Sequence, residues 1–260
     1  MKEKSLNSEQ NETLSAENAP AADERSYEER VETAVRGMTD VRGRIKAAAG
    51  ERAIRLCAAT KTVPAEVINY AIDNLGLTEI GENRVQELLD KYEALHRDKI
   101  KLHFIGSLQT NKVKYIVGKV DLIHSLDSVG LAQEIEKRSA KLGIISDVLI
   151  EINIGGERSK GGVPPEDVLG FYDSVSVFPH VRVCGIMAMA PKCDTNEEYC
   201  RYFEKTYRIF IDISGKRLHN IDSPILSMGM SGSFEQAIAC GSNMVRIGSA
   251  IFGGRVYPTR

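Results

Sequence analysis

Short apolar runs alternate with amphipathic segments along most of the chain, and the alternation is regular. The segments between the runs have helical periodicity and open with helix-start residues such as Pro64 and Ser128. Eight strands that alternate with helices are typical of a parallel sheet covered on both faces, and eight such repeats can close into a (β/α)8 TIM barrel. The runs predict strands at residues 55–61, 79–83, 102–107, 120–126, 147–154, 181–189, 224–229 and 244–252.

The chain before the first strand divides into two parts. Residues 1–25 are acidic, rich in Glu, Asn, Ser and Ala and without aromatic residues, which predicts a disordered tail. Ser26 and Glu29 then form a capping box that opens a helix extending to about residue 49, where Gly50 ends it. We therefore expect an acidic tail at 1–25 and one barrel domain with an extra N-terminal helix at 26–260.

Composition narrows the kind of ligand. The 260 residues carry a net charge of −2 with a pI near 6.3, which argues against a nucleic-acid partner and against a membrane surface. No run is long enough to span a membrane, and the polar start has no signal-peptide core. The five cysteines are scattered and contain no C-x-x-C pair, which favours a reducing cytoplasm. An open doubly wound sheet is disfavoured because its G-x-G-x-x-G turn is missing.

Lys61 closes the first apolar run, at the end of a barrel strand where active sites lie. Alternation places Cys57 and Ala59 on the same side, so small side chains would leave room beneath the amine if that face points inward. A desolvated lysine is a nucleophile toward carbonyl groups and can form a Schiff base. A solvated lysine that merely starts the loop explains the pattern equally well.

The segments 227–233 and 246–249 follow the seventh predicted strand and lie in the eighth, where barrels bind phosphate. Gly229 and Gly232 let backbone N–H groups approach an anion, and Ser231 can cap the next helix. An ordinary Gly/Ser turn is the alternative. Arg246 lies between apolar residues and needs an acceptor, which could be a phosphate, a ring nitrogen or a structural carboxylate such as Glu151.

Other polar and sulfur residues carry weaker signals. Asn83 could offer its amide to a ligand, although a helix cap is the commoner role of such a residue. His103 and His124 lack metal-ligand spacing and are expected to be core residues without a role in the site. Met187 and Met189 are most simply core, with one of them available to pack on a ligand ring.

In this order and spacing, several motifs together resemble the pyridoxal-phosphate homeostasis protein family, across residues 27 to about 255. The motifs are Ala-Thr-Lys61-Thr, Gly-Glu-Asn83 with Gln86-Glu87, His103-Phe-Ile-Gly-Ser-Leu-Gln-Thr-Asn111-Lys112, Ser227-Met-Gly-Met-Ser231 and Met244-Val-Arg246-Ile-Gly-Ser249. Two positions depart from the family pattern, namely Leu102 and the loop 157–162.

The resemblance implies a single, monomer-like barrel that binds pyridoxal 5′-phosphate (PLP), is related to the alanine racemase barrel, and buffers the cofactor supply without an established catalytic activity. It makes Lys61 the lysine that forms the Schiff base. It places the remaining cofactor-binding residues at Asn83, Ser227, Met228, Gly229, Ser231, Arg246, Gly248 and Ser249. Whether Arg246 meets the phosphate or the pyridine nitrogen stays open.

Three functions are compatible with these residues. The first is a carrier that captures PLP and passes it transiently to apo-enzymes. The second is a small amino-acid racemase with Lys61 as its base, which is disfavoured because racemase relatives resemble this barrel plus a second domain, and the sequence ends soon after the eighth strand. The third is a Schiff-base aldolase without cofactor, in which Lys61 attacks the substrate directly.

Overall fold

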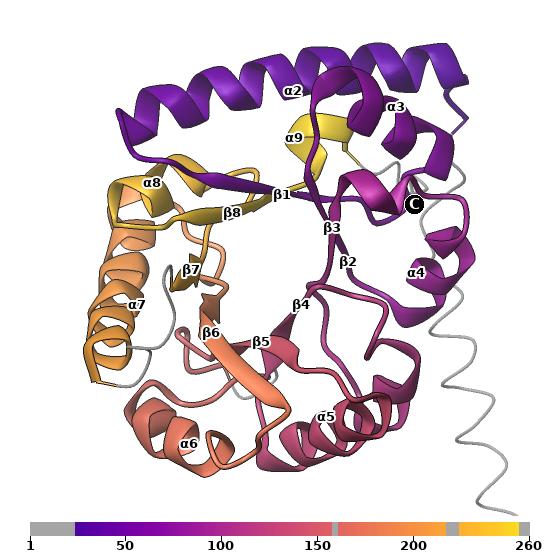
Figure 1. Ribbon diagram of the computed structural model, residues 1–260. Helices are drawn as coiled ribbons and strands as arrows, with labels where there is room; N and C mark the ends of the chain where they lie inside the picture. The colour runs from indigo at the N-terminus through magenta and orange to yellow at the C-terminus, as the bar shows by residue number, and fades with distance from the viewer. Residues whose placement is uncertain (1–23, 158–160, 217–223, 255–260) are drawn as a thin grey trace, which may run out of the picture.

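The eight predicted strands form a closed parallel barrel. The computed structural model describes residues 24–157, 161–216 and 224–254. In these residues the strands follow one another around the barrel in chain order, and β8 pairs with β1 (Figure 1). The strands are β1 (Arg55–Ala59), β2 (Glu79–Glu82), β3 (Lys101–Phe104), β4 (Leu122–Leu126), β5 (Ser146–Ile152), β6 (Val181–Ala188), β7 (Ile225–Ser227) and β8 (Met244–Ile247). The fold predicted from the sequence is therefore confirmed.

Helices surround the barrel. They are α2 (Tyr27–Ala49), α3 (Ala65–Leu75), α4 (Val85–Tyr92), α5 (Val129–Leu142), α6 (Val168–Val175), α7 (Asn196–Lys216), α8 (Phe234–Ala239) and α9 (Ser249–Phe252), with 3-10 helices η1 (Arg97–Lys99), η2 (Thr110–Tyr115) and η3 (Pro165–Asp167). None of these helices combines the length and the apolar character that crossing a bilayer requires.

The N-terminal helix α2 covers the seam of the barrel. It lies along the outside of β1 and β8 and packs on α3, α8 and α9 (Figure 1). Ser26 and Glu29 form the predicted capping box, and Gly50 ends the helix. A Cβ atom at Gly37 would lie 2.4 Å from the carbonyl oxygen of Ile251, so only glycine allows α2 to approach α9 this closely. The predicted tail falls outside the described residues up to position 23, and the loop 157–162 does so at positions 158–160.

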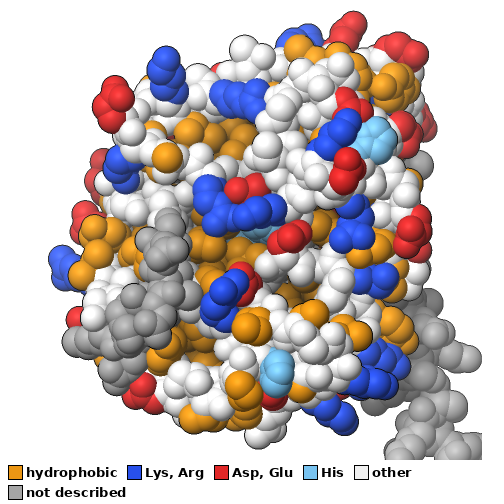
Figure 2. Space-filling model, viewed as in Figure 1, with side chains coloured by type: hydrophobic (Ala, Val, Ile, Leu, Met, Phe, Trp, Pro, Cys, Tyr) orange, Lys and Arg blue, Asp and Glu red, His pale blue; other side chains and the backbone are white. Residues whose placement is uncertain are grey.

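Two cores result from the alternation of side chains along the strands. One face of the strands packs with the helices in the large outer core. The other face fills the barrel interior with a smaller cluster drawn from several strands. Its buried members are Cys57, Ile105, Leu122, Leu149, Cys184, Met187, Ile225 and Met244. On the face of the molecule in Figure 2, basic and acidic side chains are intermixed over the centre, without a large area of one sign.

One predicted strand was wrong in extent by half its length, whereas the other seven differ from the structure by up to three residues at an end. The strand expected at 244–252 ends at Ile247, and α9 begins at Ser249 after a turn at Gly248. The apolar residues Ile251 and Phe252 belong to this short helix, where they are buried, so their hydrophobicity reflects burial of a helix and not a longer strand.

Candidate functional site

Lys61 follows the carboxyl end of β1, at the mouth of the barrel. Cys57 is buried in the interior cluster, and Ala59 packs against that cluster, which confirms the inward face expected for alternate residues of β1. On one side β1 pairs Cys57 with Arg246 of β8, and on the other it pairs Ala59 with Gly81 of β2. Lys61 itself is half-buried. It therefore lies between the loops that follow β8 and β2, at the end of the barrel where such folds carry their sites.

Unused backbone donors converge next to this mouth. Within the described chain, no hydrogen bond is donated by the backbone N–H groups of Ser231, Gly232, Gly248 and Ser249. The two loops touch, because the N–H of Ala250 donates to Ser231 Oγ at 3.3 Å. A short extra helix, α9, begins here. Loops after the seventh and eighth strands together with such a helix form the usual phosphate site of a barrel, so we call these four N–H groups the anion cradle.

The backbone shape of the cradle depends on Gly229. Its φ of +96° lies in the left-handed region, and a Cβ atom there would lie 2.6 Å from the Cβ of Ala237. Its carbonyl oxygen accepts a hydrogen bond from the N–H of Arg246 at 3.1 Å, which joins the loop after β7 to β8. Gly248 packs as closely on β1, since its Cβ would lie 2.9 Å from the carbonyl oxygen of Ala59.

The sequence predicted that Ser231 could cap the helix that follows it. This prediction was wrong. That helix, α8, begins at Phe234 with Ser233 at its N-cap position, and no side chain caps it. The hydroxyl of Ser231 instead accepts from the first turn of α9. The reason is an additional turn after β7, closed by the N–H of Met230, which donates to Ser233 Oγ at 3.3 Å. Ser231 thus links the two halves of the anion cradle.

Arg246 is buried at the floor of the mouth and holds three strands together. Its guanidinium donates to the carbonyl oxygen and the hydroxyl of Ser227 at 2.8 and 2.6 Å, and to the carbonyl oxygen of Ala188 at 3.1 Å. Burial lowers its pKa to about 10, although Cys57 and Glu151 act in the opposite direction. The partners of its guanidinium in the described chain are Ser227 and Ala188 and not a carboxylate, so Glu151 is not confirmed as its structural partner.

A chain of buried polar side chains runs from Arg246 across the barrel interior. Ser227 Oγ lies 3.3 Å from His124 Nδ1, and His124 Nε2 lies 3.0 Å from His103 Nδ1. Nε2 of His103 has no hydrogen-bond partner in the described chain and lies 3.6 Å from Glu79 Oε2. Burial lowers the pKa of His103 to about 3 and that of His124 well below its usual value. Both imidazoles are therefore neutral, and they serve as interior residues, as the sequence had indicated.

Asn83 follows β2 and brings an unpaired polar atom to the mouth. Its Oδ1 is buried and has no hydrogen-bond partner in the described chain. Gly106 allows this arrangement, since a Cβ there would lie 2.0 Å from the carbonyl oxygen of Asn83. Asn83 is not the cap of α4, whose N-cap position is held by Arg84. A buried acceptor without a partner is costly unless a ligand or water meets it, which makes Asn83 a candidate contact for a ligand.

Glu151 is a buried acidic residue near the C-terminal end of β5. Burial, assisted by the negative charge of Asp127, raises its pKa to about 7.

The methionines lie in three different environments. Met187 is buried in the barrel interior, as predicted. Met189 lies beyond the end of β6 and is 38% exposed, so the prediction of a core position for it was wrong. The side chain of Met228 lies in the outer core. Among the described residues no group of His, Cys, Asp and Glu could hold a metal ion.

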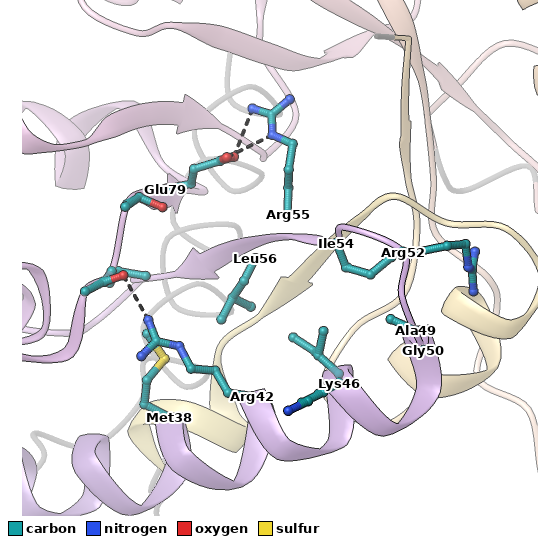
Figure 3. A pocket seen from close by; sticks show the side chains of 14 residues that line it. Met38, Arg42, Lys46, Ala49, Gly50, Arg52, Ile54, Arg55, Leu56 and Glu79 are labelled. Atoms are coloured by element: carbon teal, nitrogen blue, oxygen red, sulfur yellow. Dashed lines mark hydrogen bonds and ion pairs between the residues drawn. The ribbon is translucent and has the colours of Figure 1, made fainter.

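A second pocket lies at the opposite end of the barrel and was not predicted from the sequence. It has a volume of ≈ 460 Å³ and is formed between α2 and the start of β1 (Figure 3). Four basic side chains line it, and protein groups hold the three arginines. Arg55 is paired with Glu79 at 2.8 Å, and Arg42 donates to the carbonyl oxygen of Gly76 at 2.9 Å. Its arginines already have partners, whereas the backbone donors of the anion cradle are unused, and we assign the site to the mouth.

The family model described as "Alanine racemase, N-terminal domain" matches residues 42–256. This match and the barrel geometry define the class of the protein, a barrel of the alanine racemase N-terminal type. The pyridoxal phosphate homeostasis protein of Aquifex aeolicus is 49% identical over 82% of this chain and 92% of its own length. The protein of the same name from Escherichia coli K12 is 38% identical over 85% of this chain and 96% of its own length.

The fold is also similar to that of a solved structure. PipY of Synechococcus elongatus PCC7942, with PLP bound, has a TM-score of 0.75 and 27% identity, covering 85% of this chain and 100% of PipY. The chain belongs to the pyridoxal phosphate homeostasis protein family.

Proposed function

We propose that this protein binds PLP, holds it as a Schiff base on Lys61, and buffers and delivers the cofactor in the cytoplasm without catalytic turnover of its own. One observation carries the proposal: a lysine at the end of β1 lies at the same mouth as the anion cradle of β7 and β8. The PLP-bound structure of PipY supports the choice of ligand. The five cysteines, all unpaired, agree with a reducing compartment.

The residues at the mouth fit the parts of this cofactor. When bound, PLP supplies an aldehyde that reacts with an amine, together with a phosphate and a polar pyridine ring. The cradle N–H groups of Ser231, Gly232, Gly248 and Ser249 provide unpaired donors for the phosphate. The orphaned Oδ1 of Asn83 provides a polar contact for the edge of the ring.

Each residue then has a separate task in binding. Lys61 provides the amine, which must lose its proton before it can attack a carbonyl carbon. Arg246 provides a buried positive charge at the floor of the site, directed toward the ring nitrogen or the phosphate. The hydroxyl and carbonyl oxygens of Ser227 accept hydrogen bonds from that guanidinium and hold it in place. Met228, with its side chain in the outer core, anchors the loop that shapes the cradle.

The assignment of Lys61 is tested by borohydride reduction of the protein after incubation with PLP. The absorption spectrum is recorded before and after reduction, and the pyridoxyl group is then located by peptide mass analysis. We expect it on Lys61. The Lys61→Ala variant should show neither the Schiff-base absorption nor the modified peptide.

A matched control uses Lys192, an exposed lysine that follows the end of β6 at the same end of the barrel. The Lys192→Ala variant should label Lys61 as the wild type does. A pyridoxyl group on another lysine, or a colourless wild-type protein, would contradict the assignment. The colourless result would also restore the aldolase alternative.

Two observations favour a second function, an amino-acid racemase. The matching family model describes a domain of a racemase, and Glu151, with a pKa of about 7, could hold a proton near neutral pH. The PLP-loaded protein should be incubated with L-alanine and L-serine and the products separated by chiral chromatography. Turnover that disappears in Lys61→Ala would establish the racemase and contradict the carrier.

A further inference from the structure

Both peptide groups that flank Lys61 are anchored by side chains of α4. The carbonyl oxygen of Thr60 accepts a hydrogen bond from Lys91 Nζ at 2.9 Å. The N–H of Thr62 donates to a carboxylate oxygen of Glu87. The orientation of these two peptide planes sets the φ and ψ angles of Lys61, and hence the direction in which its side chain leaves the backbone.

The backbone here has a conformation that requires support. Thr62 has a φ of +65°, and it is the only residue other than glycine with a positive φ in the described chain. A β-branched residue in the left-handed region is strained and persists only where its surroundings hold it. The bond to Glu87 and the bond from the N–H of Val63 to the carbonyl oxygen of Thr60, at 3.0 Å, supply that support.

The anchoring residues form one ionic cluster, which we call the Glu82–Lys91–Glu87 cluster. Lys91 Nζ lies 2.9 Å from Glu82 Oε1 and 2.9 Å from Glu87 Oε1. Glu82 is fully buried, and its Oε1 also accepts from the hydroxyl of Thr60 at 2.7 Å. The ammonium group thus joins both carboxylates to the turn that contains Lys61.

Because the cluster consists of charged residues, stabilising the fold is not a sufficient explanation for it. A buried ion pair is expensive to desolvate, and apolar residues of similar size often stabilise a fold as well or better. This cluster lies next to the strained turn, and it contacts the turn through directional hydrogen bonds that apolar side chains could not make. Burial raises the pKa of Glu82, while Lys91 acts in the opposite direction, so the ammonium group helps to keep the charge on this carboxylate.

We propose that Glu82, Lys91 and Glu87 are positioning residues for Lys61, which fix the turn around it so that its amine is presented to the mouth of the barrel. This rests on the proposed function of Lys61. The three residues need not touch the cofactor, since they act through the backbone of Thr60 and Thr62. Their role is to keep the nucleophile in one direction before the ligand arrives.

Two measurements on Lys91→Met test the proposal, because methionine matches the unbranched four-atom stem of lysine and removes the ammonium group. The first is the rate of Schiff-base formation with PLP, followed by absorbance over a range of pH. We expect it to fall at least about tenfold, because the amine is no longer held in place. The second is hydrogen exchange at the Thr62 amide in the cofactor-free protein, which should become at least about tenfold faster, because the anchored turn opens locally.

The matched control is Lys99→Met, which removes the ammonium group of an ion pair with Asp73, at 2.7 Å, on the surface of the same barrel. We expect its Schiff-base rate and its exchange at Thr62 to stay within about twofold of the wild type. Glu87→Gln should lie between Lys91→Met and the wild type, since glutamine keeps an oxygen acceptor for the Thr62 amide but loses the charge. Glu87→Gln carries the same test should Lys91→Met fail to fold.

Wild-type rates of both processes in folded Lys91→Met or Glu87→Gln would overturn the proposal. Failure of the proposed function has a different signature, in which the wild-type protein itself forms no Schiff base on Lys61. Even then, exchange at Thr62 is measured without cofactor and still decides whether the cluster holds the turn.

Discussion

Replacing His124 with Gln should change how the stability of the protein depends on pH. Burial holds the pKa of His103 at about 3 and that of His124 well below its usual value. In the unfolded chain both groups take up a proton near pH 6.5. Protons therefore bind preferentially to the unfolded state, and stability is lost as the pH falls below about 6.5.

The size of the effect follows from the width of this pH range. Each neutral histidine contributes a slope of about 1.4 kcal/mol per pH unit, so acidification from about pH 7.5 to about pH 5 costs about 2 kcal/mol for each. The variant His124→Gln does not titrate at this position. Its loss of unfolding free energy over the same interval should be smaller than that of the wild type by about 2 kcal/mol.

Urea unfolding of the cofactor-free protein at the two pH values measures this difference. Comparing the change with pH, and not the stability itself, removes the constant cost of the substitution. The contribution of Glu151 also cancels. Its raised pKa of about 7 makes its effect on the pH dependence opposite in sign to that of the histidines, but this effect is the same in both proteins. His103→Gln should behave in the same way. Equal pH dependence in wild type and His124→Gln would refute a neutral, buried imidazole in the folded barrel.

Three further substitutions test other parts of the site. Arg246→Gln should leave the far-UV circular dichroism unchanged and weaken retention of PLP on dialysis by at least about tenfold, because a buried charge is lost; unchanged retention would remove Arg246 from the site. Gly229→Ala should lower the urea unfolding free energy by about 3 kcal/mol, since its φ of +96° and a Cβ 2.6 Å from that of Ala237 both oppose a side chain. Wild-type stability would show that the loop can adjust. Glu151→Gln should remove the cost of charging a buried carboxyl whose pKa is about 7, and so gain about 2.5 kcal/mol relative to the wild type at about pH 8 compared with about pH 5. The sign follows because a raised pKa destabilises the fold above that pKa and not below the unfolded value.

Most of the fold could be predicted from the sequence because its signals are local. Apolar runs, helix starts and the capping box of Ser26 and Glu29 each depend on residues close together in the chain. Chain order then fixes which strands are neighbours in a barrel, so Lys61 and Arg246 could be assigned to the same mouth.

Contacts between distant residues could not be predicted in this way. Nothing in the chain near Ser231 indicates that its hydroxyl faces α9, since that contact depends on how two loops fold back. The same holds for Lys91 beneath Thr60, and for the line of polar groups from Arg246 to His103. The family motifs included Glu87, yet only the structure shows that it supports the turn next to Lys61.

The closure of the barrel gives the site a property that neither half has alone. Lys61 follows the first strand and the anion cradle follows the last two, and these parts become neighbours only when β8 pairs with β1 under α2. A molecule that bridges amine and cradle fastens this joint, and binding to the folded state alone stabilises it in proportion to ligand occupancy. During synthesis the chain must be made through β8 before it can take up such a molecule, so only a protein with a closed barrel can carry it.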